Sequence, residues 1–310
     1  MLPAGKKSSS LDYSLLARDF LETSGEAALC KLPAGLYIVA TPIGHLGDIT
    51  LRALVTLHNV DQVACEDTRV SGGMLTKYGF KKPLLRYHDH NAEAAGAKIL
   101  EHIKAGEAIA LISDAGMPLI SDPGFGLVRS CCELGFPVTV IPGASALVTA
   151  LAGSGLPTDQ FHFAGFLPPK TAARQKAIAA LADVPGTIVL YEAPQRLADS
   201  LADLAKILGT ERQAAVAREL TKLFEETRRG TLGELAAFYA GQEVKGEIVL
   251  LIAPAAETIS HSATDVETML KDTLKTQSVR DAVNSVSIIT GTKKGEVYNL
   301  ALRLTGKDKT

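Results

Sequence analysis

The amino-acid sequence predicts an α/β fold, with two α/β domains followed by a small C-terminal helical module. Three observations lead to this prediction. Short apolar runs alternate with helical patterns, and before the hinge near 153–159 this alternation is typical of a mainly parallel sheet covered by helices on both faces. Glycine- and proline-rich loops follow three of the predicted strands. The composition, 46% hydrophobic and 21% charged, is that of an ordinary globular protein.

The first domain is expected at 34–157, after an N-terminal extension at 1–33. The extension has only a modest helical pattern near 14–22, so we expect it to be loosely attached and flexible. Within the domain, short apolar runs predict strands, and apolar positions at helical spacing predict helices. The predicted strands are 36–40, 61–65, 108–113 and 138–141, and the predicted helices are 50–58, 91–104, 126–133 and one that begins near Ser145.

The second domain is expected at 158–254, after a hinge at 153–159. Its predicted strands are 161–165, 187–191, 213–217 and 247–252, and its predicted helices are 171–182, 195–207 and 231–239. A linker at 255–265 leads into the helical module at 266–310. The module has helical patterns at 266–275, 279–286 and 294–304, with a break at Thr290 and Gly291, and it resembles a helix-turn-helix.

Charge is distributed unevenly along the chain. The formal net charge of −2 argues against broad electrostatic adhesion to nucleic acid. Residues 270–310, however, contain eight basic and four acidic side chains, a local net charge of +4. Any contact with RNA is therefore expected to be local, and we expect the C-terminal module to make it. The alternative role for this module is a helical cap on the second domain.

Apolar segments and cysteines indicate the compartment. No apolar run approaches the roughly 20 residues that cross a bilayer, and no apolar core follows the lysines of the first ten residues. We therefore expect a cytoplasmic protein with no membrane span and no secretory signal. The cysteines form no CxxC pair, which favours reduced thiols over a disulfide or a zinc site. They are Cys30, Cys65, Cys131 and Cys132.

Three loops follow predicted strands and are the strongest candidates for a ligand site. They lie at 40–44, 113–124 and 141–146. Open α/β sheets bind ligands at the carboxyl ends of their strands, and glycines let the backbone approach a ligand closely. Asp114 offers a carboxylate for hydroxyl groups or a cation, and Ser145 stands at a helix start. Any one loop could be only a tight turn, but three on successive strands favour one shared pocket.

Several other cofactor motifs do not occur. The sequence has no GxxxxGK[ST], HExxH or GxSxG motif, which argues against a P-loop, a zinc protease and a serine hydrolase elbow. The pair Gly124 and Gly126 lacks the third glycine of a dinucleotide fingerprint. The glycine-rich first turn of Rossmann-like methyltransferases is also absent.

Two polar clusters have both a chemical and a structural interpretation. The run 66–69 follows a predicted strand, and its two carboxylates and arginine could supply a base and a phosphate-binding cation. The alternative is a helix N-terminus whose acids suit the helix dipole. His88 and His90 resemble a metal-ligand pair, but no further ligand is placed nearby, so we favour a loop or cap role and expect no metal.

Further polar residues lie in the second domain. Strands there are predicted to end in the runs 191–196 and 217–222, and lysines and arginines surround the helix start near Lys170. We expect these positions to lie beside a ligand that binds between the two domains. For isolated residues, surface ion pairs and a solvated helix face are the alternative explanations.

The motifs taken together resemble the tetrapyrrole methylase superfamily. Within it they are most similar to the ribosomal RNA small subunit methyltransferase I branch, the 16S rRNA cytidine 2′-O-methyltransferases. The resemblance covers about 34–254 and continues into the helical module. One departure is that the superfamily commonly has Gly-Asp-Pro where this chain has Ser113, Asp114 and Ala115. The motif segments are 39–48, 65–69, 113–118, 121–124, 142–146, 191–196 and 217–222.

The resemblance implies two α/β domains with S-adenosylmethionine in the cleft between them, and a homodimer. It places the cofactor contacts at Pro42, Ile43, Gly44, Asp114, Gly116, Met117, Ile120, Ser145, Ala146, Tyr191, Ala217 and Glu247. The expected partner is 16S rRNA in the 30S subunit, and the residues expected to contact RNA are Arg69, Lys170, Arg174, Arg196, Lys293 and Lys294. Our catalytic hypothesis is that Glu66 or Asp67 deprotonates the acceptor hydroxyl while Arg69 holds a neighbouring phosphate.

Two alternatives to RNA methylation stay open. A methylase acting on a corrin or siroheme precursor would share the fold and the cofactor but would need neither a basic tail nor the 66–69 motif. A non-enzymatic ribosome-assembly factor would use the fold as a scaffold. Titration with S-adenosylmethionine distinguishes the scaffold, and the choice of methyl acceptor distinguishes the two enzymes.

Overall fold

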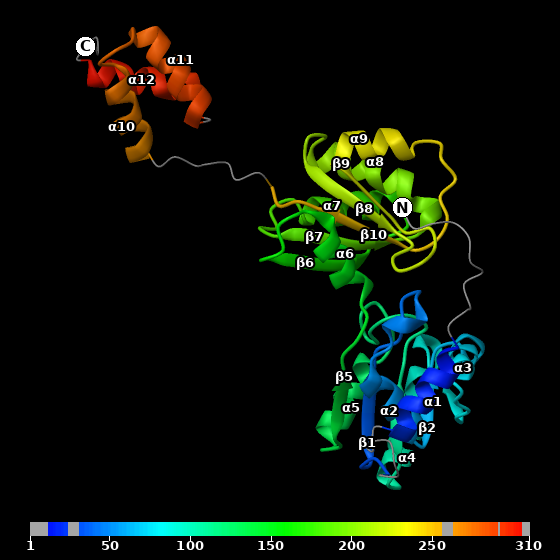
Figure 1. Cartoon of the computed structure of the whole chain (residues 1–310). Coiled ribbons are helices and arrows are strands. Elements are labelled where there is room, and N and C mark those ends of the chain that lie inside the picture. The colour runs from blue at the N-terminus through cyan, green and yellow to red at the C-terminus, as the bar shows by residue number, and fades with distance from the viewer. Residues whose placement is uncertain (1–11, 24–30, 256–262, 291, 306–310) are drawn as a thin grey trace. The chain divides into compact units, whose positions relative to one another are not determined.

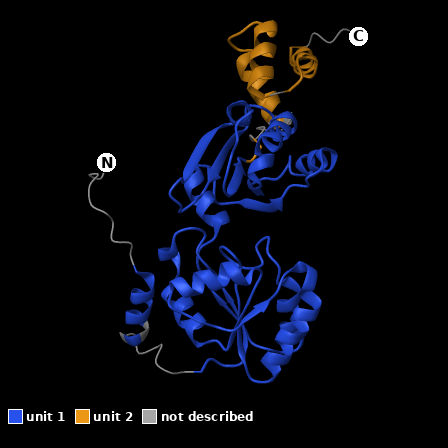
Figure 2. Cartoon of the chain, turned by 90° about the vertical axis from the view of Figure 1, so that its right-hand side faces the viewer, with its two compact units in different colours: residues 1–253 blue, residues 254–310 orange. Residues whose placement is uncertain are grey.

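The computed structural model describes residues 12–23, 31–255, 263–290 and 292–305 (Figure 1). The chain forms two compact units, residues 1–253 and 254–310 (Figure 2). The expected fold class is confirmed, since the first unit contains two five-stranded sheets with helices and the second contains a helical region. Across the described ranges, no helix has the length and apolar character needed to span a bilayer.

The first sheet is entirely parallel. Its strands lie in the order β3-β2-β4-β1-β5, and every neighbouring pair is parallel. The carboxyl ends of all five strands therefore lie at one edge of the sheet, and the three predicted loops at 40–44, 113–124 and 141–146 follow strands at this edge. The strands are β1 (Gly35–Val39), β2 (Gln62–Cys65), β3 (Leu84–Arg86), β4 (Ala108–Leu111) and β5 (Val138–Ile141).

Alternate residues of these strands face two separate cores. Tyr37 and Val39 of β1 pack with helices α2 (Leu51–Asn59) and α3 (Thr68–Lys77). Leu36 and Ile38 point the other way, toward α4 (Ala92–Lys104) and α5 (Phe125–Glu133). Successive strand side chains point to opposite faces, so a continuous apolar run serves both layers. Figure 2 shows helices on both sides of this sheet.

The N-terminal extension differs from its prediction. We expected loose attachment, but α1 (Tyr13–Thr23) packs on the first domain and its Ala17 is 1% exposed. Tyr13, Ala17 and Phe20 stand at helical spacing and contact the core under α2 and α3. The ring of Tyr13 meets that of Tyr78 edge to face at 6.3 Å. Residues 1–11 and 24–30, including Cys30, lie outside the described residues.

The second sheet is mixed. Its strand order is β6-β7-β10-β8-β9, with β6 parallel to β7 and the other pairs antiparallel. Three elements of the first unit were not predicted as such: α3, β3 and β9. β9 has the sequence ETRRGT, which contains no apolar alternation and is a strand because it pairs with β8. The strands are β6 (Phe161–Phe166), β7 (Thr187–Glu192), β8 (Gln213–Arg218), β9 (Glu226–Thr231) and β10 (Ile248–Ile252).

The two faces of the second sheet have different covers. One face packs against α7 (Thr171–Ala180), α8 (Leu197–Leu208) and α9 (Leu232–Tyr239). On the other face, α6 (Ala146–Ser154) packs against apolar residues such as Val189 and Val249. Ile43, from the loop after β1, joins the same cluster. The predicted first domain at 34–157 includes the residues of α6, but their packing on the second sheet joins the loop after β5 to that sheet.

The second unit is a three-helix cluster within its described residues. α10 (Ala263–Thr273), α11 (Val279–Thr290) and α12 (Lys294–Leu304) follow the three predicted helical patterns. They enclose a small core of their own that includes Leu270, Val286 and Val297. Gly291 of the predicted break and residues 256–262 of the predicted linker lie outside the described residues.

Candidate active site

The three glycine-rich loops contact one another at the carboxyl edge of the first sheet. The amide of Thr41 donates to the carbonyl of Gly116 at 2.9 Å, and the amide of Gly116 donates to the carbonyl of Thr41 at 3.0 Å. A side chain at Gly143 would place its Cβ 2.8 Å from the Cβ of Ala40, so only glycine fits there. Backbone contacts of this kind hold the first two loops together and bring the third against the first.

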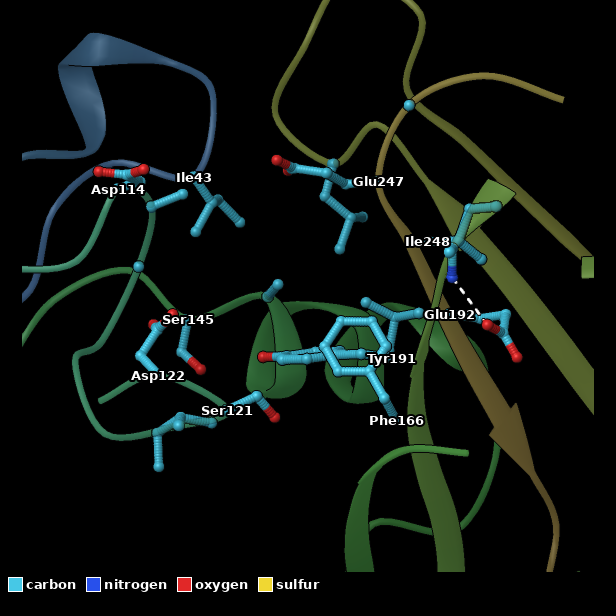
Figure 3. Close-up of a pocket in the computed structure, with 18 of the residues that line it drawn as sticks. Ile43, Asp114, Ser121, Asp122, Ser145, Phe166, Tyr191, Glu192, Glu247 and Ile248 are labelled. Carbon is cyan, nitrogen blue, oxygen red and sulfur yellow. Dashed lines mark hydrogen bonds between the residues drawn. The ribbon is translucent and has the colours of Figure 1, made fainter. Parts of the chain in front are cut away.

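These loops and the edge of the second sheet surround a cavity of about 420 Å³. That volume lies within the range of small-molecule sites. Figure 3 shows Asp114, Asp122 and Ser145 on one side of the cavity and Tyr191 and Glu247 on the other. Nine of the residues expected to bind the cofactor line it: Ile43, Asp114, Gly116, Met117, Ile120, Ser145, Ala146, Tyr191 and Glu247.

Three residues expected at the ligand do not line this cavity. Pro42 is buried beside it, and Ala217 is 1% exposed within the core between α6 and the second sheet. Gly44 instead contacts the loop after β8, where a Cβ would lie 2.5 Å from Cγ of Lys222. The neighbouring amide of His45 donates to Oγ1 of Thr221 at 3.0 Å. Gly44 thus allows the first loop to dock on the second sheet.

Eleven further residues line the cavity and were not among the predicted contacts. Some belong to the loop at 113–124, which the sequence identified only as a whole. The rest come from the second sheet: Glu192, Ala193, Pro194 and Leu220 belong to the motif segments 191–196 and 217–222, whereas Phe166, Gly246, Ile248 and Val249 lie outside the motif segments and reach the cavity through the sheet topology. The eleven are Ala115, Ser121, Asp122, Phe166, Glu192, Ala193, Pro194, Leu220, Gly246, Ile248 and Val249.

The charged side chains that line the cavity, among the described residues, are all carboxylates. Burial raises the pKa of Asp122 to about 6, and the nearby charges of Glu66 and Asp114 add to this effect. Burial also raises the pKa of Asp114, against the opposing hydrogen bond from the amide of Asp67. An acidic wall of this kind favours a ligand that carries positive charge.

The other two carboxylates have basic partners. Glu192 is 3% exposed, and its Oε1 lies 3.2 Å from Nε of Arg196. Nζ of Lys222 lies 3.1 Å from Oε2 of Glu247 and 2.8 Å from Oε1 of Glu219. Arg196, one of the residues expected to contact RNA, supports the cavity wall by holding Glu192 and donating to the carbonyl of Leu167.

The run 66–69 forms the helix N-terminus that was its structural alternative. Asp67 caps α3 by accepting from the amide of Arg69 at 2.8 Å. The guanidinium of Arg69 lies 2.7 Å from Oδ2 of Asp67 and, with the hydrogen bonds, holds the pKa of this carboxyl well below its usual value. So stable a carboxylate is a weak base, which argues against Asp67 in our catalytic hypothesis. Glu66 is exposed and lines a small cavity next to Asp122.

The sequence matches two described families. Residues 35–236 match the family described as "Tetrapyrrole (Corrin/Porphyrin) Methylases", and residues 260–305 match the "RsmI C-terminal HTH domain". The chain is 47% identical over 274 residues to "Ribosomal RNA small subunit methyltransferase I" of Mesorhizobium japonicum, covering 88% of this chain and 93% of the relative. The chain belongs to the ribosomal RNA small subunit methyltransferase I family.

Other members of the ribosomal RNA small subunit methyltransferase I family match over a similar length. The protein of that name from Pseudomonas aeruginosa is 43% identical over 279 residues, 88% of this chain and 98% of the relative. Among solved structures, a cobalt precorrin-4 methyltransferase has a TM-score of 0.53 at 17% identity, covering 70% of this chain and 94% of that one. Diphthine synthase has a TM-score of 0.56 at 14% identity, covering 70% and 89%. At these identities the structures bear on the fold alone.

The remaining residues expected to contact RNA in this family member lie in different environments. Arg174 is 4% exposed, and its Nε lies 2.7 Å from Oδ2 of Asp203, so its prediction as a surface contact is wrong. The side chain of Arg69 is 85% exposed. Lys170 is exposed at the start of α7, and Lys293 and Lys294 are exposed at the start of α12.

The histidine pair takes part in local structure. The amide of His88 donates to Oδ1 of Asn91 at 2.8 Å, which forms a turn before α4. In the described part of the chain, no three histidine, cysteine, aspartate or glutamate side chains gather closely enough to hold a metal ion.

Proposed function

We propose that this chain transfers a methyl group from S-adenosylmethionine to the ribose 2′-hydroxyl of a cytidine in 16S rRNA of the small ribosomal subunit. The observation that carries the proposal is the carboxylate-walled cavity formed by the three loops and the second sheet. The relatives' name supports small-subunit rRNA as the acceptor. The resemblance of the motifs at 39–48 and 65–69 to the 2′-O-methyltransferase branch supports the cytidine ribose.

The residues around the cavity fit S-adenosylmethionine. This molecule carries an ammonium and a sulfonium, and the carboxylate of Asp114 complements this positive charge. Ile43 and Met117 give the cavity an apolar wall for the adenine. Ser145 is the N-cap of α6 without a side-chain hydrogen bond to the helix, so its hydroxyl and the first helix amides are suited to a ligand carboxylate.

Catalysis in this proposal depends mainly on alignment. When bound, S-adenosylmethionine supplies an electrophilic methyl carbon on its sulfonium. The loop contacts between Thr41 and Gly116 fix the cavity wall, against which a bound donor and the attacking hydroxyl would be aligned. Holding two reactants in such a geometry contributes roughly 7–11 kcal/mol to lowering the barrier. Phe166 and Tyr191, with ring centroids 5.7 Å apart, form an apolar wall that limits water at the reacting atoms.

RNA reaches the cavity in a conformation that exposes the target ribose. A nucleotide must be splayed from its stack to enter such a pocket. We assign binding of the surrounding RNA to the second unit, whose Lys293 and Lys294 are exposed. Arg69 and Lys170 are exposed cations of the first unit that suit phosphate contacts.

The proposal includes a homodimer. β5 is an edge strand of the first sheet, and its Val140 is 51% exposed. The neighbouring helix α5 exposes Phe125, and Leu134, directly after this helix, is also exposed. Exposed apolar side chains beside an unpaired strand edge are features of a subunit interface.

Methyl transfer from labelled S-adenosylmethionine tests the function. The acceptors are 30S subunits from a strain that lacks the enzyme, free 16S rRNA, and a corrin or siroheme precursor. We expect label in a 2′-O-methylcytidine of 16S rRNA after nucleoside mapping, and a large loss of transfer with Asp114→Asn. Label only in the tetrapyrrole contradicts the proposal and supports the alternative enzyme. No measurable binding of S-adenosylmethionine supports the scaffold instead.

A further inference from the structure

We propose that Asp122 is the general base of the reaction, accepting the proton of the attacking hydroxyl. This inference rests on the proposed function and adds the residue that activates the acceptor. It replaces Asp67 of the earlier hypothesis, which is committed to capping α3 and pairing with Arg69.

The position of Asp122 suits this role. Among the described residues, it lines both the main cavity and a small cavity of about 10 Å³ that Glu66, Tyr87 and Ser113 also line. The small cavity has room for about one water molecule. Asp122 therefore connects the space for the reactants with the exposed carboxylate of Glu66. This arrangement gives the proton a route from the hydroxyl toward solvent.

The loop that carries Asp122 is held in an unusual conformation. Leu119 and Ser121 have φ angles of 70° and 64°, in the left-handed region that non-glycine residues rarely adopt. Gly124 has a φ angle of 139°, and a Cβ there would lie 2.9 Å from Cδ2 of Leu111. Backbone strain of this kind persists only where the surroundings fix it, and it gathers at functional sites. Here it orients the carboxylate of Asp122 toward the cavity.

The lining carboxylates differ in their neighbours, and this difference selects Asp122. Glu192 is paired with Arg196, and Glu247 with Lys222. Asp114 accepts a hydrogen bond from the amide of Asp67 at 3.4 Å and complements the positive charge of the donor.

The charges that act on Asp122 are those of Glu66, Asp114 and Asp89, and all three are negative; the hydroxyl of Ser113 opposes them. These charges and burial raise the pKa of Asp122 to about 6, near that of an efficient base at neutral pH. Burial, together with the nearby charge of Asp122, raises the pKa of Tyr191 on the second sheet.

The chemical step is balanced without any further reactant. The hydroxyl proton passes to the carboxylate of Asp122 as the ribose oxygen forms a bond to the methyl carbon. The bond between that carbon and sulfur breaks, and its electron pair stays on sulfur, which leaves a neutral thioether. The proton then leaves through the small cavity to solvent.

Single-turnover methyl transfer to unmodified 30S subunits between pH 5 and 9 tests the assignment. We compare the wild-type chain with Asp122→Asn, Asp122→Glu and the matched control Asp159→Asn, which changes an exposed aspartate in the loop before β6. As the pH is lowered, the wild-type rate should fall to half of its value at high pH near pH 6. Asp122→Asn should lower the rate at pH 8 by about 100-fold or more and remove this fall, with affinity for S-adenosylmethionine within about threefold of wild type. Asp122→Glu should recover part of the rate.

A second variant tests the charge environment. Glu66→Gln removes a negative neighbour that raises the pKa of Asp122, so the fall in rate should move to lower pH. The base assignment is wrong if Asp122→Asn keeps the wild-type rate and its fall near pH 6, or if it loses affinity for S-adenosylmethionine. If the wild-type chain methylates none of the acceptors, the proposed function itself fails.

Discussion

At the scale of single residues, carboxylates that look alike in the sequence have opposite surroundings. Asp67 is bonded to Arg69, whereas Asp122 faces the negative charges of Glu66 and Asp114. From the sequence alone, Asp67 was a candidate base within the motif at 66–69, and Asp122 was only one residue of the loop at 113–124. The difference depends on which strand ends lie side by side, and a linear motif does not contain that information.

Replacing Asp122 should stabilise the protein at neutral pH. The pKa of this carboxyl rises from an ordinary 3.8 to about 6 on folding, so its ionisation opposes the folded state above pH 6 and has no such effect below the unfolded pKa. Asp122→Asn should therefore raise the melting temperature relative to wild type at pH 8, and the gain should shrink as the pH falls toward 4. Differential scanning calorimetry across this range measures the effect. A loss of stability at pH 8 that does not depend on pH would contradict it.

The pair of Arg174 and Asp203 should contribute to stability and not to RNA binding. Both residues are buried, so Arg174→Ala leaves an uncompensated charge, and we expect a loss of about 3–5 kcal/mol in the free energy of unfolding. Urea denaturation measures this loss, with exposed Lys170→Ala as a control expected within about 0.5 kcal/mol. A stable Arg174→Ala variant with weakened RNA binding would refute this account. The sequence showed only charges near a helix start, because burial of Arg174 depends on α8.

At the scale of elements, strands with a longer apolar run were predictable, whereas the three-residue β3, the polar β9 and the glycine-containing α3 were not. The buried run of β10, with every residue buried, is visible as an apolar segment. β9 lacks such a run and is identifiable only through its partner β8. α1 has its apolar stripe in the sequence, but its docking depends on the surface that α2 and α3 present.

The close approach at Gly143 provides a test of the loop arrangement. Gly143→Ala places a Cβ 2.8 Å from that of Ala40, so we expect a cost of about 1–3 kcal/mol in stability and weaker binding of S-adenosylmethionine. Gly126→Ala is the matched control, because it lies in α5 with no atom within 4 Å of the added Cβ. This control should be stabilising by up to about 1 kcal/mol. Equal effects of the two changes in chemical denaturation would mean that the loops do not meet as described.

At the scale of the whole molecule, each of the two units has its own core. The three helices of the second unit enclose Leu270, Val286 and Val297 without help from the first unit's described residues. The sequence indicated both sheets, the three loops and this helical module. It did not indicate that α6 would cover the second sheet, because that packing joins residues distant in the sequence.

Removing the second unit should separate RNA binding from cofactor binding. We expect a chain that ends at Ala253 to bind 16S rRNA at least about tenfold more weakly, with a smaller dependence on salt, because phosphate contacts are lost. Its affinity for S-adenosylmethionine should stay within about twofold of the full chain. Filter binding across a salt series and calorimetry measure the two affinities. Unchanged RNA affinity would assign the module to the alternative role of a helical cap.

The most direct test of the account is calorimetric titration of the full chain with S-adenosylmethionine. The central claim concerns one acidic pocket, which the loops after β1, β4 and β5 form with the second sheet. We expect saturable binding of one ligand per chain, weakened about tenfold or more by Asp114→Asn and unaffected by Asp159→Asn. Absence of binding by the folded wild-type chain, or equal binding by Asp114→Asn, would contradict that claim.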